Sequence, residues 1–224
     1  MKSFLRVLVT SMILGMLVVF SPDLQAHTAN RPTPQTSISK FRLDKPNEDA
    51  FSGTLYATIN GQEKKIADDV NDAWLINDGR MLVYSRRDGS GGFEDEGQSL
   101  RTYDARTGKI KKIMSEYVMV DTVTEVKTSR GKTALLVRMT DGGLGAYYLA
   151  VVDPTRGEVF FTKWARVLSR KGDIIRVGYY REDIDWTAFY QNENPPIRPY
   201  KIRSYNLSAL LRRPVIYNKR DRPF

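Results

Sequence analysis

The fold is decided by the stretch Ala73-Trp-Leu-Ile-Asn-Asp-Gly-Arg-Met-Leu-Val-Tyr-Ser85, together with Ser99-Leu-Arg-Thr-Tyr-Asp104 and Lys109-Ile-Lys-Lys-Ile113. Apolar and polar residues alternate in it, and turn residues interrupt the alternation, which is typical of antiparallel strands joined by short hairpins. Glycine at 79 and 108 allows the positive φ that tight turns need. The stretch therefore predicts four short strands in an antiparallel meander.

The same layout recurs along the chain. A leading half unit covers residues 52–66, and two further units cover 122–162 and 165–217. The turn glycines Gly61, Gly108 and Gly157 are 47 and 49 residues apart. A period in the forties with four strands per unit is typical of propeller blades. We predict an all-β fold, a small or incomplete β-propeller of four-stranded antiparallel blades with about three full units plus a half.

The number of blades leaves two arrangements open, because closed propellers typically have about four to eight blades. In one, the N-terminal arm and the C-terminal segment complete the broken blade of a four-bladed ring. In the other, an open array of sheets is closed by a partner. A propeller-like fold is favoured because closure removes exposed sheet edges, and an ordinary β-sandwich is the remaining alternative.

Two turn motifs carry a resemblance to a known family. The segments 78–85 and 100–109 contain an Asp-Gly turn and an Asp-x-x-x-Gly turn, and 152–157 repeats the second motif. They resemble the blade motif of bacterial exported β-propellers of the TolB-like and WD-repeat-like superfamily. The third unit departs from it, having Asn-Leu-Ser-Ala-Leu from Asn206, where we expect a turn before a last strand over 214–217. The resemblance implies a fold and no catalytic residue.

The first 26 residues predict export. Basic residues at positions 2 and 6 precede an apolar run over 7–20, and Leu-Gln-Ala ends at Ala26. This pattern predicts a signal peptide cleaved after Ala26 and a periplasmic or secreted protein. An uncleaved membrane anchor is the alternative, but the run is shorter than the roughly 20 residues that a helix needs to cross a bilayer. No later segment is apolar enough to span a membrane.

The remaining chain divides into an arm and one domain. Residues 27–51 are rich in Thr, Ser, Asn, Pro and charge, which predicts a flexible arm with one strand near Ser39 to Leu43. Residues 52–224 then form the propeller-like β domain. Its size suits one domain with a core of its own.

Composition excludes several kinds of site. The chain has no cysteine, which excludes disulfides, a lipid-modified cysteine, thiolate metal sites and a cysteine nucleophile. Its one histidine, His27, falls beside the predicted cleavage site. A copper site at a new N-terminus would need a second imidazole, and a Ser-His-Asp triad would need a histidine in the domain. We therefore expect no catalytic residue, no metal site and no cofactor.

Basic residues gather at one end of the predicted blades. The mature chain keeps a net charge of +8, because the leader takes away two of the 35 basic and one of the 26 acidic residues. In an antiparallel blade the first and third turns share a face, and we predict that this face docks to an anionic surface. The residues are Lys109, Lys111, Lys112, Arg130, Lys132, Arg156, Arg170 and Lys171. The alternative is that hairpin turns favour solvated basic residues, which also protect strand edges.

Acidic and aromatic residues gather in the middle loops, on the opposite face. We predict a binding site there, formed by Asp88, Glu94, Asp95, Glu96, Asp141, Asp183, Asp185, Trp186, Phe189 and Tyr190. Its carboxylates suit Ca²⁺ or a sugar, although no fixed coordination pattern is present. Its aromatic rings suit a protein or a sugar. Solvated loops and rings that cap the core are the alternatives.

These features predict a binding or scaffolding module. We expect an exported, soluble protein that recognises a protein or an anionic envelope polymer through its blade loops. The alternative is a small carbohydrate-active or metal-dependent hydrolase, in which two loop carboxylates flank the scissile bond. Export argues against nucleic acid as a partner.

Overall fold

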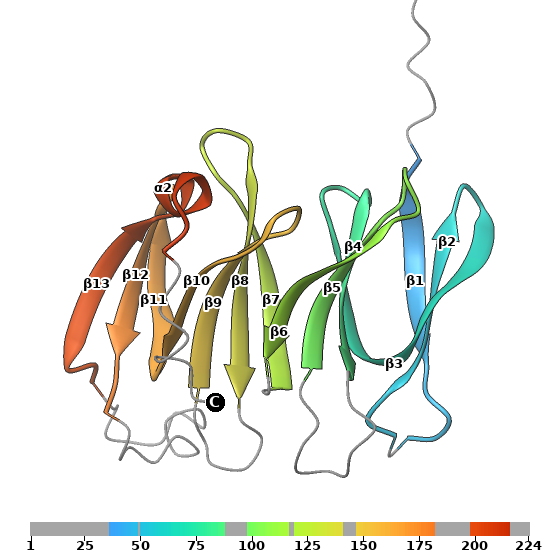
Figure 1. The fold of residues 1–224 in the computed structure, drawn as a ribbon, viewed down its shortest axis with the longest axis horizontal. Helices are drawn as coiled ribbons and strands as arrows, with labels where there is room; N and C mark the ends of the chain where they lie inside the picture. The colour runs from blue at the N-terminus through green and yellow to red at the C-terminus, as the bar shows by residue number, and fades with distance from the viewer. Residues whose placement is uncertain are drawn as a thin grey trace, which may run out of the picture. The chain divides into compact units, whose positions relative to one another are not determined.

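The computed structural model describes residues 36–48, 50–87, 98–116, 119–140, 147–181 and 198–215 of the 224-residue chain. All of them belong to one compact unit, Gln35–Phe224. They form strands β1 to β13 and a short helix, α2, and every strand pairing is antiparallel (Figure 1).

The strands form three sheets in which neighbours in sequence are neighbours in space. The first sheet contains β1 (Ile38–Asp44), β2 (Gly53–Ile59), β3 (Gln62–Ile76), β4 (Met81–Arg87), β5 (Gln98–Asp104) and β6 (Ile110–Glu116). The second contains β7 (Met119–Lys127), β8 (Thr133–Thr140), β9 (Tyr147–Asp153) and β10 (Gly157–Lys163). The third contains β11 (Ala165–Lys171), β12 (Ile174–Tyr179) and β13 (Lys201–Asn206), which α2 (Leu207–Arg212) follows.

Strand β3 belongs to two blades. Its first part pairs with β2 and its second part with β4. The sequence predicted two separate strands here, and this prediction is wrong. Asp69 has a φ of 58°, and the β3–β4 register shifts between Val70 and Asp72, so the strand changes partner without leaving the sheet. We call β1, β2 and the first part of β3 blade 1, the rest of β3 with β4–β6 blade 2, β7–β10 blade 3 and β11–β13 blade 4.

Most of the predicted hairpin turns are confirmed. Positive φ occurs at the turn glycines Gly61, Gly79, Gly108, Gly131, Gly157 and Gly172. Two features of Gly79 exclude a larger residue. Its φ of +82° disfavours any side chain, and an added Cβ would lie 2.8 Å from the carbonyl oxygen of Ile38. That carbonyl comes so close because the amide of Ile38 donates to the carbonyl of Gly79 at 2.7 Å.

At the N-terminal end of the described chain a predicted strand is confirmed, and at the C-terminal end a predicted turn is replaced by a helix. The strand predicted near Ser39 to Leu43 is confirmed as β1, which pairs with β2, so the first sheet begins before Ser52. The turn predicted near Asn206 is wrong, because helix α2 starts there. The Asn206 side chain accepts a hydrogen bond from the amide of Ala209 at 2.9 Å, which caps the helix. Of the strand predicted over 214–217, residues 214 and 215 are irregular and the rest lie outside the described part.

Three clusters of buried side chains hold the four blades together. One joins blades 1 and 2 around Leu55 and Tyr84, and a second joins blades 2 and 3 around Leu100 and Val137. The third joins blades 3 and 4 and includes Phe160 and the buried leucines of α2. Each interface packs one sheet face against the next, and a two-layer sandwich would have a single interface of this kind. The fold is therefore an all-β incomplete propeller.

Blade 1 ends the array with a polar face. Arg42, Tyr56 and Lys65 are in register across its three strands. Arg42 forms hydrogen-bonded ion pairs with Glu63 at 2.9 and 3.0 Å and lies 4.2 Å from the centre of the Tyr56 ring. Lys65 pairs with Asp68 at 2.8 Å. Repeat proteins commonly end in a unit with such a polar outer face, which keeps the last sheet soluble.

Candidate functional site

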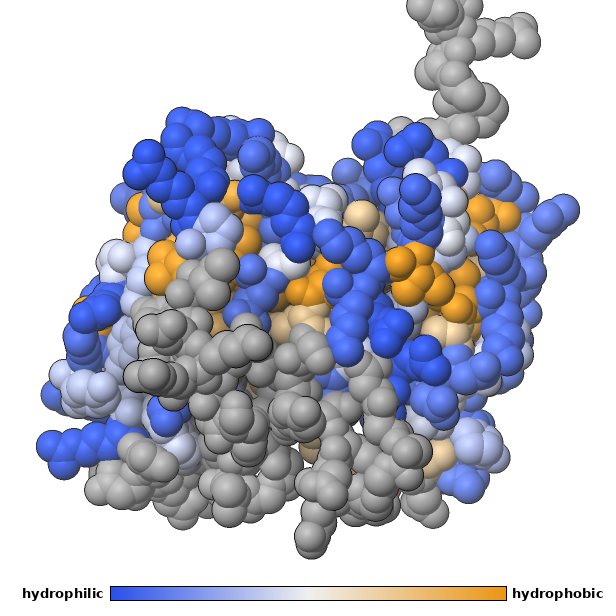
Figure 2. Space-filling model, in the orientation of Figure 1, coloured by the Kyte–Doolittle hydropathy of each residue, from blue (hydrophilic) through white to orange (hydrophobic). Residues whose placement is uncertain are grey.

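The hairpin turns of all four blades lie at one end of the strands, which we call the turn face (Figure 1). It consists of residues 60–61, 77–80, 104–109, 128–132, 153–157 and 172–173. Figure 2 shows that hydrophilic residues cover this end in the view drawn, with hydrophobic residues below them over the strands. Of the eight basic residues that the sequence singled out, four lie in these turns, Lys109, Arg130, Lys132 and Arg156. The other four lie on strands next to them, Lys111 and Lys112 on β6 and Arg170 and Lys171 on β11.

Two aspartates shape the turns that carry two of these basic residues, Lys109 and Arg156. Asp104 Oδ1 accepts hydrogen bonds from the amides of residues 106 and 107, both at 2.9 Å. Asp153 Oδ1 accepts in the same way from the amides of Thr155 at 2.9 Å and Arg156 at 3.1 Å. These are Asx turns, in which the carboxylate replaces a backbone acceptor. The acids of the Asp-x-x-x-Gly motif therefore fix the turn and are not displayed to a ligand.

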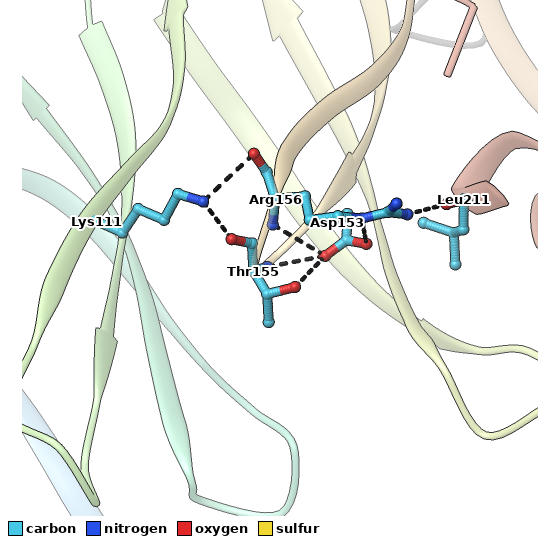
Figure 3. A network of polar contacts seen from close by, with 5 residues as sticks. All are labelled: Lys111, Asp153, Thr155, Arg156 and Leu211. Atoms are coloured by element: carbon cyan, nitrogen blue, oxygen red, sulfur yellow. Dashed lines mark hydrogen bonds and ion pairs between the residues drawn. The ribbon is translucent and has the colours of Figure 1, made fainter. Parts of the chain in front are cut away.

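Asp153 also anchors a network that crosses three blades (Figure 3). Its Oδ2 accepts a hydrogen bond from Arg156 Nε at 2.8 Å, and Arg156 Nη2 donates onward to the carbonyl of Leu211 in α2. From blade 2, Lys111 Nζ donates to the carbonyls of Thr155 and Arg156, the second at 3.4 Å. Two of the predicted anion-binding residues, Lys111 and Arg156, thus hold blades 2, 3 and 4 together at the turn face.

A second network joins the first turns of blades 2 and 3. Lys127 Nζ donates to Asn77 Oδ1 and to Thr133 Oγ1, the latter at 2.9 Å, and pairs with Glu125 at 2.8 Å. Glu125 Oε1 in turn accepts from the amide of Asn77 at 3.1 Å. Because Asn77 has a φ of 52°, the turn presents both its amide and its side chain to blade 3.

A third network joins the first turns of blades 3 and 4 around Asp173. Its Oδ1 accepts from the amide of Ser129 at 2.6 Å, and its Oδ2 accepts from Ser129 Oγ at 2.8 Å and from Ser208 Oγ. Arg170 Nη2 donates to the carbonyl of Lys127 at 2.9 Å. These contacts place turn 128–132 directly beside turn 172–173. Sequence reasoning missed Asp173, whose three contacts join residues 35 and 44 positions apart.

Hydrogen bonding lowers the pKa of both aspartates. At Asp173, the Ser208 hydroxyl contributes most and the Ser129 amide follows, while burial opposes them. At Asp153, burial raises the pKa, but the hydrogen bonds from Thr155 and Arg156 outweigh it and the net shift is downward. Both carboxylates are therefore held in the charged form, which their donors stabilise.

The remaining predicted basic residues are displayed rather than buried. Lys109, Lys112, Arg130, Lys132 and Lys171 are all exposed. Within the described part of the chain, the side chains of Arg130, Lys132 and Lys171 form no hydrogen bond or ion pair. Arg130 and Lys132 lie in turn 128–132, and Lys171 ends β11 immediately before turn 172–173. Because Asp173 joins these two turns, the three residues form one basic cluster. We call them the basic triad.

The predicted acidic and aromatic site lies outside the described residues. It comprises Asp88, Glu94, Asp95, Glu96, Asp141, Asp183, Asp185, Trp186, Phe189 and Tyr190. The strands that flank the segment 88–97 end and begin at the edge opposite the turn face, because β4 and β5 are antiparallel. The site itself remains a prediction.

The described residues contain neither a cluster of metal-binding side chains nor a membrane-spanning helix. Among them, no group of three or more acidic or histidine side chains is arranged to hold a metal ion. No helix in the described part of the chain has both the length and the apolar character needed to cross a membrane.

Comparisons with known proteins give structural similarities at low identity. No family model and no curated protein matches the chain. Its fold is similar to the β-propeller domain of the Trilobed protease from Pyrococcus furiosus, which is described as having an open velcro topology, with 12% identity and a TM-score of 0.44. It is also similar to an acylaminoacyl peptidase of Pyrococcus horikoshii, with 15% identity and a TM-score of 0.41.

The chain matches only parts of these structures. The similarity covers 77% of this chain and 55% of the Trilobed protease domain, and 66% of this chain and 29% of the peptidase. The chain thus spans about half or less of each structure. The class of protein is defined by the chain's own sheets: it is an incomplete β-propeller whose turns display a basic cluster.

Proposed function

We propose that the protein is an exported binding module that docks to an anionic polymer of the cell envelope through its turn face. The observation that carries this proposal is the basic triad, Arg130, Lys132 and Lys171, which is exposed at the two turns that Asp173 joins. Export is supported by the leader pattern of residues 1–26.

The triad is held on a rigid support. Ser129 and Asp173 fix the two turns relative to each other, and Arg170 adds a bond across them to the carbonyl of Lys127. Basic side chains on a fixed backbone lose less conformational entropy when they bind than side chains on a mobile loop. This arrangement favours binding of closely spaced anionic groups.

A polymer is the ligand that suits such a surface. Lys109 lies at the third turn of blade 2, and Lys112 lies next to it on β6, the outermost strand of that blade. Exposed positive charge therefore extends beyond the triad. Exposed charges act through water and are screened by salt, so one anionic group would bind weakly. Repeated anionic groups on one chain bind several of these charges at once, which raises the overall affinity.

The direct test is binding of the mature protein to polygalacturonate, with neutral dextran as the reference polymer, at low and at physiological salt. The test variant is R130Q/K132Q/K171Q. We expect binding to polygalacturonate that weakens as salt rises, and an affinity that falls about tenfold or more in the variant, which corresponds to about 1.4 kcal/mol. Isothermal titration calorimetry measures both.

The matched control is K45Q/K163Q/K201Q, which removes the same charge from the opposite ends of β1, β10 and β13. This control should bind like the unaltered protein. Equal weakening by both variants would mean that net charge alone drives binding, and would overturn the assignment to the turn face. Equal binding to dextran would overturn the requirement for an anionic polymer.

A further inference from the structure

A cavity lies between blades 3 and 4, away from the basic triad. It has a volume of about 550 Å³, within the usual range of small-molecule sites, about 300–1,000 Å³. It is lined on one side by the middle of β7 and β8 and the first residues of β9, and on the other by the first residues of β11.

The cavity exists because the interface between the two blades changes character along the strands. Toward the turn face, Val126 and Ala134 pair across the sheet and belong to the apolar cluster between the blades. Further along the strands, Thr122 is paired with Arg138, and Arg138 with Leu149. On β7 the short side chains of Thr122 and Thr124 stand where apolar residues would otherwise pack. The side chains of the two sheets therefore leave a gap between them there.

The cavity lining combines positively charged, hydroxyl-bearing and apolar side chains. Two guanidinium groups, Arg138 and Arg166, come from opposite sides of the cavity, and the hydroxyls of Thr122 and Thr124 lie on β7. Leu149 and Val167 supply apolar surface. No acidic residue lines the described wall of the cavity.

Both arginines are positioned by neighbours. Arg138 forms an ion pair with Asp121, which immediately precedes Thr122 on β7. Arg166 Nε donates to the hydroxyl of Tyr180 at 3.0 Å, and its guanidinium carbon lies 5.6 Å from the centre of that ring. Tyr180 is buried, and its amide donates to the carbonyl of Trp164 at 2.8 Å, so the support of Arg166 is itself fixed. Held side chains reduce the entropy that binding would cost.

From this geometry we infer that the cavity is a binding site for a small organic acid. Its carboxylate pairs with the guanidinium of Arg166, its apolar body lies against Leu149 and Val167, and the threonine hydroxyls bond its polar substituents. Guanidinium groups bind carboxylates through two parallel hydrogen bonds, a geometry that ammonium groups do not offer.

The test uses benzoate as the probe, with the isosteric neutral benzamide as the reference. Amide chemical shifts of the ¹⁵N-labelled mature protein are followed during titration with each. We expect saturable shifts with benzoate at residues 122, 124, 138 and 166, and no saturation with benzamide. Arg166→Gln should weaken benzoate binding about tenfold or more, the scale of one charge-assisted hydrogen-bonded pair.

Two further variants keep the result interpretable. Arg176→Gln removes an exposed charge from β12 of the same blade without touching the cavity lining, and should leave benzoate binding unchanged. Thr122→Val keeps the shape of the cavity wall and removes one hydroxyl, so it tests the site even if Arg166→Gln unfolds. It should weaken binding of 3-hydroxybenzoate more than binding of benzoate. Absence of saturable benzoate shifts, equal binding of benzamide, or full binding by a folded Arg166→Gln variant would each overturn the proposal.

Discussion

At the scale of single residues, two aspartates form the same kind of turn, but only one of them is also linked to a neighbouring blade. Asp104 and Asp153 both accept backbone amides in an Asx turn. Asp153 is buried and also binds Arg156, which continues to the carbonyl of Leu211 (Figure 3). The same sequence motif therefore closes a hairpin at one position and helps to join three blades at the other.

The first prediction compares these two residues. Asp153→Ala should lower the free energy of unfolding by about 2 kcal/mol, because it removes a buried carboxylate that accepts two backbone amides, the Thr155 hydroxyl and the Arg156 guanidinium. Asp104→Ala, the matched control, removes the same Asx turn at a partly exposed site and should cost less than about 1 kcal/mol. Urea denaturation measures both, and equal losses would show that the cross-blade network adds no stability.

The second prediction concerns pH. The pKa of Asp173 is lowered by Ser208 and Ser129, so its stabilising effect is complete above the usual pKa of aspartate, about 3.9, and is lost as the pH falls through the lower folded value. Asp173→Asn should therefore flatten the fall in melting temperature at acid pH. An unchanged pH profile would contradict the role given to Asp173.

The third prediction concerns Asp72, whose pKa is raised on folding, whereas that of Asp173 is lowered. Desolvation raises the pKa of Asp72, Lys45 opposes the rise and Asp121 adds to it. The charged form of Asp72 is thus disfavoured on folding, and the penalty is present above its raised pKa and disappears as the pH falls. Asp72→Asn should raise the melting temperature at neutral pH and leave it nearly unchanged in acid. A lower melting temperature at neutral pH would contradict this.

At the scale of elements, helix α2 takes the position where a last hairpin was expected. Its leucines at 207, 210 and 211 recur at helical spacing, and all three are buried in the cluster between blades 3 and 4. Asn206 caps the helix, and Ser208 on the same helix binds Asp173. The helix therefore completes the core of the last blade and supports the turn face at once.

The fourth prediction tests that role. Leu211 is fully buried, so Leu211→Ala should lower the free energy of unfolding by about 3 kcal/mol through lost apolar contacts and the remaining cavity. Leu75 on β3 is 37% exposed, and Leu75→Ala should cost less than about 1 kcal/mol. Similar losses from the two variants would mean that α2 contributes little to the core.

At the scale of the whole molecule, the blades are stacked in sequence order. Blade 3 lies between two apolar clusters, because Leu135 and Val137 of β8 belong to one and Ala134 and Leu136 to the other. Strand β1 is at the edge of its sheet, and so is β13. A linear stack of this kind depends on nearest-neighbour interfaces, so stability varies along it.

The fifth prediction follows from this stacking. Amide hydrogen exchange should be slowest in β8 and β9, whose strands pack on both faces, and faster by orders of magnitude in β1 and β13 at the edges. Mass spectrometry of exchanged peptides resolves these strands. Uniform protection would instead indicate one cooperative unit that opens all at once.

The sequence by itself determined the all-β class, the repeat, the hairpin turns and the strand near Ser39 to Leu43. Each depends on interactions between residues close in sequence, such as glycine with positive φ at 61 and 108 and aspartate accepting amides two or three residues onward. Local rules are therefore enough to place them. The basic residues at the turns could also be assigned to one face from strand direction alone.

Only the tertiary structure decided how these parts combine. The partner change of β3, the burial of α2 and the support of the basic triad by Asp173 all depend on contacts between residues far apart in the chain. It also separated Lys111 and Arg156, which bind neighbouring blades, from Arg130, which is displayed. The physical reason is that the environment of a charged side chain is set by its packed neighbours, which a local pattern does not specify.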